Sequence, residues 1–239
     1  MHQDMTDALE ALRYEDDARC LVITGAADVF SAGMDLKEYF MALRDDPREY
    51  ERVWRLSVKW RAHTLRHYPK PAIAMVNGFC FGGAFSIVEG CDLAIAAEEA
   101  TFGLSEINFK LFPGGPVSKS LANLLRPRDA LWFGMTGRPF DGKTAEKIGL
   151  VNMAVSRANL LQETMQVARE LAAKDTYAMA ATKQAYYASL DMGWEAAMDY
   201  SFAKEQELVL RQKDAFKTEG IGDFLKGKYK PGLESHDAA

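Results

Sequence analysis

Cysteine and histidine are scarce in this sequence of 239 residues, which contains three cysteines and four histidines. Cys20, Cys80 and Cys91 lie far apart, with no pair at zinc-ligand spacing, so we expect three reduced thiols rather than a disulfide scaffold. His63 and His67 are four residues apart and could share a helix face, but no carboxylate motif accompanies them. We therefore expect no metal site.

The sequence also lacks long apolar runs and any excess of positive charge. No run approaches the roughly 20 apolar residues that cross a bilayer. The acidic, amphipathic residues 1–17 differ from a secretory signal, which is basic and then apolar. The formal net charge of −5 argues against a nucleic-acid-binding surface. We therefore expect neither a membrane nor a nucleic acid as partner, and we expect the protein in the cytoplasm.

Short apolar runs alternate with amphipathic stretches in the first half of the chain. The hydrophobic fraction of 48% is enough for the core of one compact domain. Helices are predicted near residues 5–12, 35–44, 47–68 and 82–89. Strands are predicted at Cys20–Ile23, Pro71–Val76, Asp92–Ala97 and Ala100–Gly103. Because continuous apolar strands alternate with helices, we expect an α/β fold with a mostly parallel sheet covered on both faces.

From about residue 115 the strand signals nearly vanish and helical patterns take over. Helices are predicted near residues 116–125, 127–135, 142–148, 157–173, 176–190 and 193–212. No linker separates the two halves of the chain. The sequence therefore predicts one domain over residues 1–239, with a β/α core to about residue 190 and a helical region over about 191–239.

Two loops rich in small residues are candidates for ligand binding. Ser31–Met34 precedes a predicted helix, and Gly82-Gly83 opens another helix directly after a strand. Small residues let a ligand approach the backbone, and N–H groups at a helix start point outward. One donor from each loop could clamp a developing oxyanion. The glycine pair is neither a dinucleotide fingerprint nor a phosphate loop, because GxGxxG and Gly-Lys-Ser/Thr are absent.

Glu106 is a lone carboxylate in an apolar, aromatic-rich stretch between Phe102 and Phe112. Burial there would raise its pKa and suit it for proton transfer. Each of these features also has an ordinary explanation: a turn, helix packing, and a surface carboxylate or cap. The residues alone predict an α/β enzyme with a candidate oxyanion site.

In combination, these motifs resemble the enoyl-CoA hydratase/isomerase (crotonase) superfamily over about residues 7–231. The resemblance implies a ββα spiral core and an acyl-CoA thioester substrate whose enolate is held in an oxyanion hole. By match to the family, the oxyanion donors are Met34 and Gly83, and the CoA-binding residues are Ala32, Lys37 and Gly82.

The acid/base residues are similar to those of the hydroxycinnamoyl-CoA (feruloyl-CoA) hydratase-lyases within this family. Simple hydratases use two glutamates, whose positions match Ser86 and Glu106 here. The resemblance implies that water adds to the Cα=Cβ bond of feruloyl-CoA or 4-coumaroyl-CoA. Retro-aldol cleavage then gives acetyl-CoA and an aromatic aldehyde, vanillin or 4-hydroxybenzaldehyde. Glu106 would move protons, Ser86 would hold water or the new hydroxyl, and Tyr39 would bind the phenol. No cofactor is implied, because the coenzyme A belongs to the substrate.

Two departures from that pattern are visible. The second phenol-binding tyrosine of those enzymes matches Phe202, which can stack on a ring but cannot donate a hydrogen bond. Tyr200 lies two residues away on the same predicted helix. The family's opening strands are missing, which would leave one sheet edge unpaired. The resemblance of the helical tail implies a homotrimer or a dimer of trimers. Lys226, Lys228 and Lys230 could meet CoA phosphates, or they form a solvated basic tail, which is the more common case.

Two alternatives remain open. One is another enoyl-CoA hydratase or isomerase reaction without C–C cleavage, which Ser86 in place of a glutamate disfavours. The other is a non-catalytic homologue that binds acyl-CoA or a protein partner. Phe202 and the missing strands suggest this second alternative, whereas the set of Met34, Gly83 and Glu106 opposes it.

Overall fold

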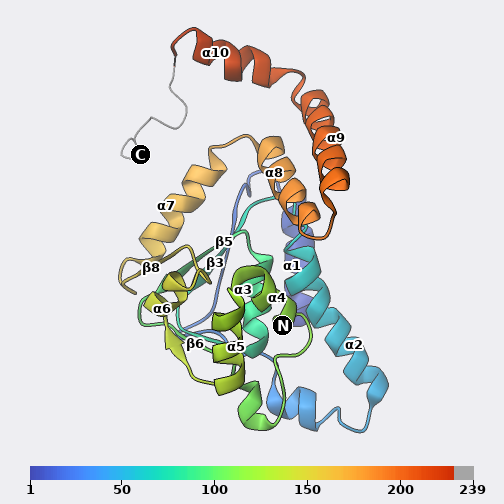
Figure 1. Ribbon diagram of the computed structural model, residues 1–239, viewed down its shortest axis with the longest axis vertical. Helices are drawn as coiled ribbons and strands as arrows, with labels where there is room; N and C mark the ends of the chain where they lie inside the picture. The colour runs from blue at the N-terminus through green and yellow to red at the C-terminus, as the bar shows by residue number, and fades with distance from the viewer. Residues whose placement is uncertain (229–239) are drawn as a thin grey trace. The chain divides into compact units, whose positions relative to one another are not determined.

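The computed structural model describes residues 1–228 and divides into two compact units (Figure 1). The first unit is Met1–Lys174, and the second begins at Asp175. The first unit contains strands β1 to β8, whereas residues 175–228 of the second unit form helices and turns. The sheets and the cavity that they support therefore belong to the first unit.

Two four-stranded sheets organise the first unit. One has the order β1-β3-β5-β8 and is parallel throughout; the other has the order β2-β4-β6-β7 and is parallel except for the β6–β7 pair. The pairs β1–β2, β3–β4 and β5–β6 each send one strand to each sheet and are followed by helices, whereas α6 (Gly142–Lys147) separates β7 from β8; this order confirms the predicted α/β fold with its ββα units. The strands are β1 (Leu21–Thr24), β2 (Val29–Ser31), β3 (Ala72–Val76), β4 (Phe79–Phe81), β5 (Leu93–Ala97), β6 (Thr101–Gly103), β7 (Phe140–Asp141) and β8 (Met153–Val155).

Strand β3 lies inside the first sheet, between β1 and β5. This position explains why the sequence of β3 is apolar at consecutive positions rather than at alternate ones. Its residues Ala72, Ile73, Ala74 and Val76 are fully buried, because helix α7 (Leu160–Ala172) packs against β1, β3 and β5. A strand that is covered on both faces needs apolar side chains on both. The backbone N–H of Ala72 donates to the Asp92 carboxylate at 2.8 Å, which ties the start of β3 to the start of β5.

Aromatic side chains join the second sheet to helix α3 (Phe85–Gly90). The rings of Phe102 on β6 and Phe140 on β7 stack with centroids 5.5 Å apart, and Phe85 meets both edge-on. All three side chains are buried. Offset and edge-on ring pairs stabilise a core beyond the area that they bury. They also anchor α3, and with it the glycine pair that precedes this helix.

The remaining helices of the first unit surround these sheets. Helix α2 (Pro47–Val58) begins where expected: Asp46 accepts a hydrogen bond from the N–H of Glu49, and Pro47 occupies the first turn. The predicted helix 47–68 is one α-helix only to Val58, after which the chain continues as a π-helical segment, η2 (Lys59–Thr64). The others are α1 (His2–Arg13), η1 (Leu36–Met41), η3 (Gly82–Ala84), η4 (Ser105–Phe109), α4 (Val117–Leu124), α5 (Pro127–Thr136) and α6 (Gly142–Lys147).

The expectation of an all-helical chain beyond residue 115 was wrong at two strands. β7 pairs with β6, and β8 extends the first sheet beside β5. Strands of two and three residues are too short to show a period of two, so their partners decide their conformation rather than their own side chains. The same reason explains why β2 and β4 were not predicted.

In the second unit, α8 (Thr176–Ser189) packs against α9 (Trp194–Gln212), followed by η5 (Phe216–Ile221) and α10 (Gly222–Leu225). The Asp175 carboxylate caps α8 by accepting from the N–H of Ala178 at 2.7 Å, and it also accepts from the Gln212 amide at 2.7 Å. Because α8 packs on α9, this unit begins earlier than the helical region expected from about residue 191. Within residues 1–228, no helix combines the length and the apolar content needed to span a membrane.

Candidate active site

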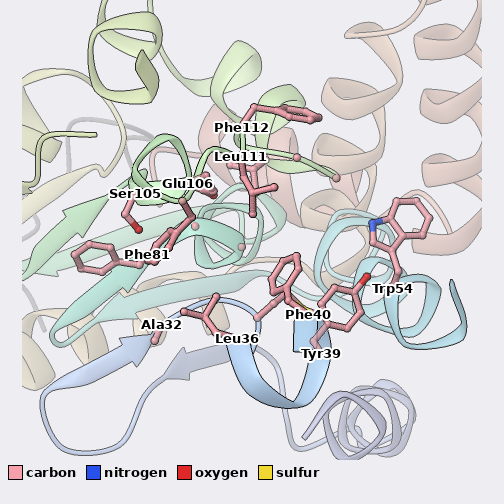
Figure 2. Close-up of a pocket in the computed structure, with 18 of the residues that line it drawn as sticks. Ala32, Leu36, Tyr39, Phe40, Trp54, Phe81, Ser105, Glu106, Leu111 and Phe112 are labelled. Carbon is pink, nitrogen blue, oxygen red and sulfur yellow. The ribbon is translucent and has the colours of Figure 1, made fainter. Parts of the chain in front are cut away.

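Three neighbouring strands bring the predicted loops together. β2, β4 and β6 are adjacent and parallel, so their carboxyl ends meet at one edge of the sheet, where open α/β sheets bind ligands. The loop Ala32–Met34 follows β2, Gly82-Gly83 follows β4, and Glu106 lies on η4 after β6. All three line a cavity of about 400 Å³ (Figure 2).

Gly33 allows the first loop to lie against the second. Its φ of 86° belongs to the left-handed region that favours glycine, and a Cβ there would lie 3.0 Å from Phe81 O and 3.3 Å from Gly83 N. Any side chain at position 33 would therefore push the two loops apart. The predicted oxyanion donors, Met34 and Gly83, belong to loops in direct contact, which is the arrangement that their predicted role requires.

The glycine pair is similarly restricted. Gly82 has a φ of 53°, and a Cβ at Gly83 would lie 2.3 Å from Arg61 Nη1. Two side chains hold the Gly83 carbonyl oxygen: the Ser86 hydroxyl donates to it at 2.7 Å and Arg61 Nη1 donates at 3.3 Å. These bonds fix the orientation of the backbone at the point where Gly83 faces the cavity.

The structure places Ser86 behind the cavity rather than in it. The hydroxyl is fully buried and bonded to the carbonyl of Gly83, and Ser86 is not part of the cavity wall. The predicted contact of Ser86 with water or a substrate hydroxyl therefore disagrees with this geometry, because the first turn of α3 directs the side chain back to Gly83.

Glu106 faces the glycine pair from the opposite loop. Its Oε1 lies 3.1 Å from the position that a Cβ on Gly82 would occupy, so a larger residue at position 82 would crowd the carboxylate. Its Oε2 is buried and has no hydrogen-bond partner in residues 1–228. Burial raises the pKa of Glu106, partly offset by a hydrogen bond from its own backbone. A carboxyl with a raised pKa and one unpartnered oxygen suits proton transfer at neutral pH.

Tyr39 is positioned by the cap of its own helix. The Asp35 carboxylate accepts from the N–H groups of Lys37 and Glu38 at 2.8 and 2.7 Å, which starts η1 (Leu36–Met41). The Tyr39 ring is buried and stacks on Tyr50, with centroids 4.3 Å apart. Burial raises the pKa of Tyr39, and the neighbouring Tyr50 raises it further, so the hydroxyl stays protonated.

The structure thus brings together most of the predicted site. Among the described residues, the cavity wall includes Ala32, Met34, Tyr39, Gly82, Gly83 and Glu106, but not Ser86 or Lys37. Lys37 is exposed to solvent, where the cap turns it outward. Phe202 and Tyr200 lie on α9 in the second unit, where Phe202 is 65% exposed. Lys226 and Lys228 pair with Asp223, and Lys230 lies outside the described residues. The binding roles of Lys37, Phe202, Tyr200, Lys226, Lys228 and Lys230 stay predictions.

Three cavity residues were missed by the sequence reasoning: Tyr50, Trp54 and Arg61. They lie four and then seven residues apart along α2 and η2, which places them on one helix face. That spacing was visible in the sequence, but nothing in it indicated that this face looks into a cavity. Most of the remaining wall is apolar and comes from Leu36, Phe40, Phe81, Phe109, Leu111, Phe112 and Val117.

Figure 2 shows how these groups divide the cavity. Glu106 and Ser105 lie on one side, Tyr39, Phe40 and Trp54 lie on another, and Leu111 and Phe112 come in from the loop above. The arrangement combines two backbone loops, one carboxyl and an apolar wall. Such a site can bind a flat apolar group, exclude water from it, and stabilise an oxyanion that forms beside the carboxyl.

The chain belongs to the enoyl-CoA hydratase/isomerase family, whose model matches residues 1–233. Over 238 residues it is 42% identical to the hydroxycinnamoyl-CoA hydratase-lyase of Pseudomonas fluorescens, a match that covers 99% of this chain and 86% of that protein. It is 32% identical over 225 residues to the human mitochondrial enoyl-CoA hydratase domain-containing protein 3, covering 93% of this chain and 70% of that one.

Solved structures agree with this family. An enoyl-CoA hydratase from Mycobacterium smegmatis superposes with a TM-score of 0.86 at 26% identity, over 98% of this chain and 88% of that one. One from Polaromonas sp. JS666 gives a TM-score of 0.84 at 30% identity, over 97% and 88%. The chain therefore has the fold of this enzyme family, and its cavity lies where three predicted loops of the site converge.

Proposed function

We propose that this protein hydrates a 4-hydroxycinnamoyl-CoA thioester and then cleaves the product to an aromatic aldehyde and acetyl-CoA. The observation that carries the proposal is the position of Glu106. Among the described residues that line the cavity it is the sole carboxylate, and it faces the glycine pair at which an oxyanion would form. The similarity to a hydroxycinnamoyl-CoA hydratase-lyase along nearly the whole chain supports the choice of substrate.

In the proposed hydration, the Glu106 carboxylate removes a proton from water as the water oxygen bonds to Cβ. The electron pair of the Cα=Cβ bond moves toward the thioester, whose oxygen becomes an enolate. The backbone N–H groups of Met34 and Gly83 donate to that oxygen. The protonated Glu106 then delivers its proton to Cα, which restores the carboxylate and leaves a β-hydroxy thioester.

In the proposed cleavage, the same carboxylate removes the proton of the β-hydroxyl. The Cα–Cβ bond breaks and the aldehyde leaves. The electron pair of that bond forms the enolate of acetyl-CoA, whose oxygen accepts from the same two N–H donors. Glu106 protonates Cα, so each cycle consumes one water and returns Glu106 to its starting state. Because both steps place negative charge on the thioester oxygen, one oxyanion hole serves both. The steps use the chain's own groups and the thioester, without a cofactor.

The remaining proposed contacts rest on the similarity to the family, and of these residues Ala32, Gly82 and Tyr39 line the cavity. Ala32, Gly82 and Lys37 would meet the coenzyme A, and Tyr39 would meet the phenol of the substrate. Phe202 or Tyr200 would contact the aromatic ring. We propose that the chain assembles as a homotrimer or a dimer of trimers, which analytical ultracentrifugation would distinguish from a monomer.

The test is to incubate the purified protein with feruloyl-CoA and measure vanillin and acetyl-CoA in equal amounts, with Glu106→Gln beside it. Aldehyde from the native protein and a loss of at least about 10²-fold in the variant would support the proposal. A β-hydroxy thioester that accumulates without aldehyde would assign hydration alone. Bound coenzyme A thioester with no turnover would favour a non-catalytic binding protein.

A further inference from the structure

Arg61 is a buried cation without an acidic partner. Its side chain is 6% exposed, and in the part of the chain that the structure describes it makes no ion pair. Its hydrogen bond goes to Gly83 O, which is neutral. Arg66, whose side chain is 12% exposed, shows the usual arrangement, because it pairs with Glu89 at 3.0 Å. A buried charge normally has a counter-charge, since its desolvation is costly.

Two donors at this position lack acceptors. Arg61 Nε is buried and makes no hydrogen bond within residues 1–228, and the buried Tyr39 hydroxyl has no partner at hydrogen-bond geometry there, although the Tyr50 hydroxyl lies close enough to raise its pKa. Buried polar atoms are nearly always partnered, so two orphans on the wall of one cavity indicate a ligand. The two groups are close enough that the charge of Arg61 acts on Tyr39.

The groups around Arg61 leave it charged. Burial lowers the pKa of Arg61 to about 10, and Tyr39 works in the opposite direction, so the guanidinium is a cation at neutral pH. The other titratable neighbour is His2, whose pKa is lowered by burial and then by the charge of Arg61. Neither neighbour is a carboxylate. An anionic group of a ligand that enters the cavity would supply the missing counter-charge.

We propose that Arg61 and Tyr39 form a subsite that binds an acidic oxygen at the end of the acyl group and holds the phenol of 4-hydroxycinnamoyl-CoA as phenolate. The choice of this ligand rests on the proposed function. One phenolate oxygen accepts from both Arg61 Nε and the Tyr39 hydroxyl, and its proton leaves to solvent on binding. Tyr50, stacked on Tyr39, keeps the ring of Tyr39 in place.

The subsite selects by charge. A thioester without the hydroxyl, or with a methoxy group in its place, leaves Arg61 desolvated and uncompensated. A ligand analogue that leaves buried polar groups of a site unpaired binds more weakly than the true ligand by a large factor. We expect 4-coumaroyl-CoA to bind at least about 10-fold more tightly than cinnamoyl-CoA or 4-methoxycinnamoyl-CoA, which differ from it only at this position.

The experiment uses binding rather than turnover, in the Glu106→Gln protein, which would hold the substrate unreacted. The absorbance of bound 4-coumaroyl-CoA, titrated with pH, gives the pKa of its phenol, because the phenolate absorbs at longer wavelength. We expect a pKa lower than that of the free thioester by about 1 unit or more. A further Arg61→Gln change should abolish this shift, while Arg61→Lys should keep part of it. Arg157→Gln, which removes an exposed arginine outside the cavity, should change nothing.

The comparison of three thioesters needs no change at Arg61 and so covers the case in which Arg61→Gln does not fold. Equal affinities for the three, or a phenol pKa that matches the free thioester, would overturn the proposal and leave Arg61 as a brace for Gly83. If the native protein makes no aldehyde but prefers 4-coumaroyl-CoA and lowers its pKa, the lyase assignment fails and the subsite stands.

Discussion

The Ser86 hydroxyl donates a 2.7 Å hydrogen bond to the Gly83 carbonyl oxygen, one residue from the loop that would hold the oxyanion. This contact makes Ser86 a support for the glycine pair. We expect Ser86→Ala to lower the free energy of unfolding by about 1 kcal/mol, because a buried acceptor loses a donor. Activity should fall less than about 10-fold, since Arg61 still donates to Gly83 O.

A matched control for this variant is Ser120→Ala. Ser120 is buried and donates to the Pro116 carbonyl at 3.0 Å, and it does not line the cavity. Both variants should lose similar stability in urea unfolding, and only Ser86→Ala should reduce kcat. Complete loss of activity in Ser86→Ala with unchanged stability would instead show that Ser86 acts on the substrate or water.

Gly83→Ala should abolish activity without unfolding the protein. The new Cβ would lie 2.3 Å from Arg61 Nη1, so the arginine or the loop has to move. Displacing one oxyanion donor costs about 10²–10³ in kcat. Gly134→Ala is the control, because its Cβ meets nothing closer than 3.8 Å and it lies within helix α5. Steady-state kinetics with near-native activity in Gly83→Ala would refute this role for the loop.

The pH dependence of the reaction should report Glu106. The base form is the active one, and burial raises the pKa of Glu106 above its ordinary value of 4.5. The ratio kcat/KM should therefore fall as pH decreases through a pKa above 4.5, since this ratio titrates the free enzyme. A limb at or below 4.5 in the pH–rate profile would show that the carboxyl is not desolvated during catalysis.

The same shift predicts an effect on stability. Because the pKa of Glu106 is higher in the folded than in the unfolded protein, the folded state binds more protons between the two values, and stability falls as pH rises through that window. Glu106→Gln removes this penalty and should raise the Tm at pH 7, although it abolishes activity. At a pH below the unfolded pKa the two proteins should differ little, which calorimetry at two pH values would test.

Tyr39→Phe should weaken recognition of the hydroxylated substrate. The ring and its stacking on Tyr50 remain, and one donor is lost. We expect kcat/KM for 4-coumaroyl-CoA to fall about 10-fold, with a much smaller change for cinnamoyl-CoA. Tyr68→Phe is the control: its hydroxyl donates to Leu9 O at 2.7 Å, so that variant should lose stability and keep its selectivity. Equal losses on both substrates would argue against a phenol contact.

Much of the fold could be predicted from local pattern. The buried strands β3 and β5 are apolar at nearly every position, and Asp46 and Asp175 cap the starts of α2 and α8. The short strands β2, β4, β7 and β8 were not predicted, because two or three residues have no period and take their conformation from neighbouring strands. Helices α8 and α9 were predicted. Their packing against each other, which makes Asp175 the start of the second unit, was not.

The candidate site shows the same division. The sequence by itself determined the chemical groups: a glycine at position 33, the pair Gly82-Gly83, and one carboxylate at Glu106 in an apolar stretch. Only the tertiary structure decided which of them face one cavity, because the pairing of β2, β4 and β6 brings distant loops to one edge. It directs the Ser86 hydroxyl to the Gly83 carbonyl, and it places Arg61 in the cavity wall, although no sequence pattern around Arg61 indicated a ligand-binding residue. Burial and the missing counter-charge of Arg61 depend on packing between segments far apart in the chain, and local sequence does not encode them.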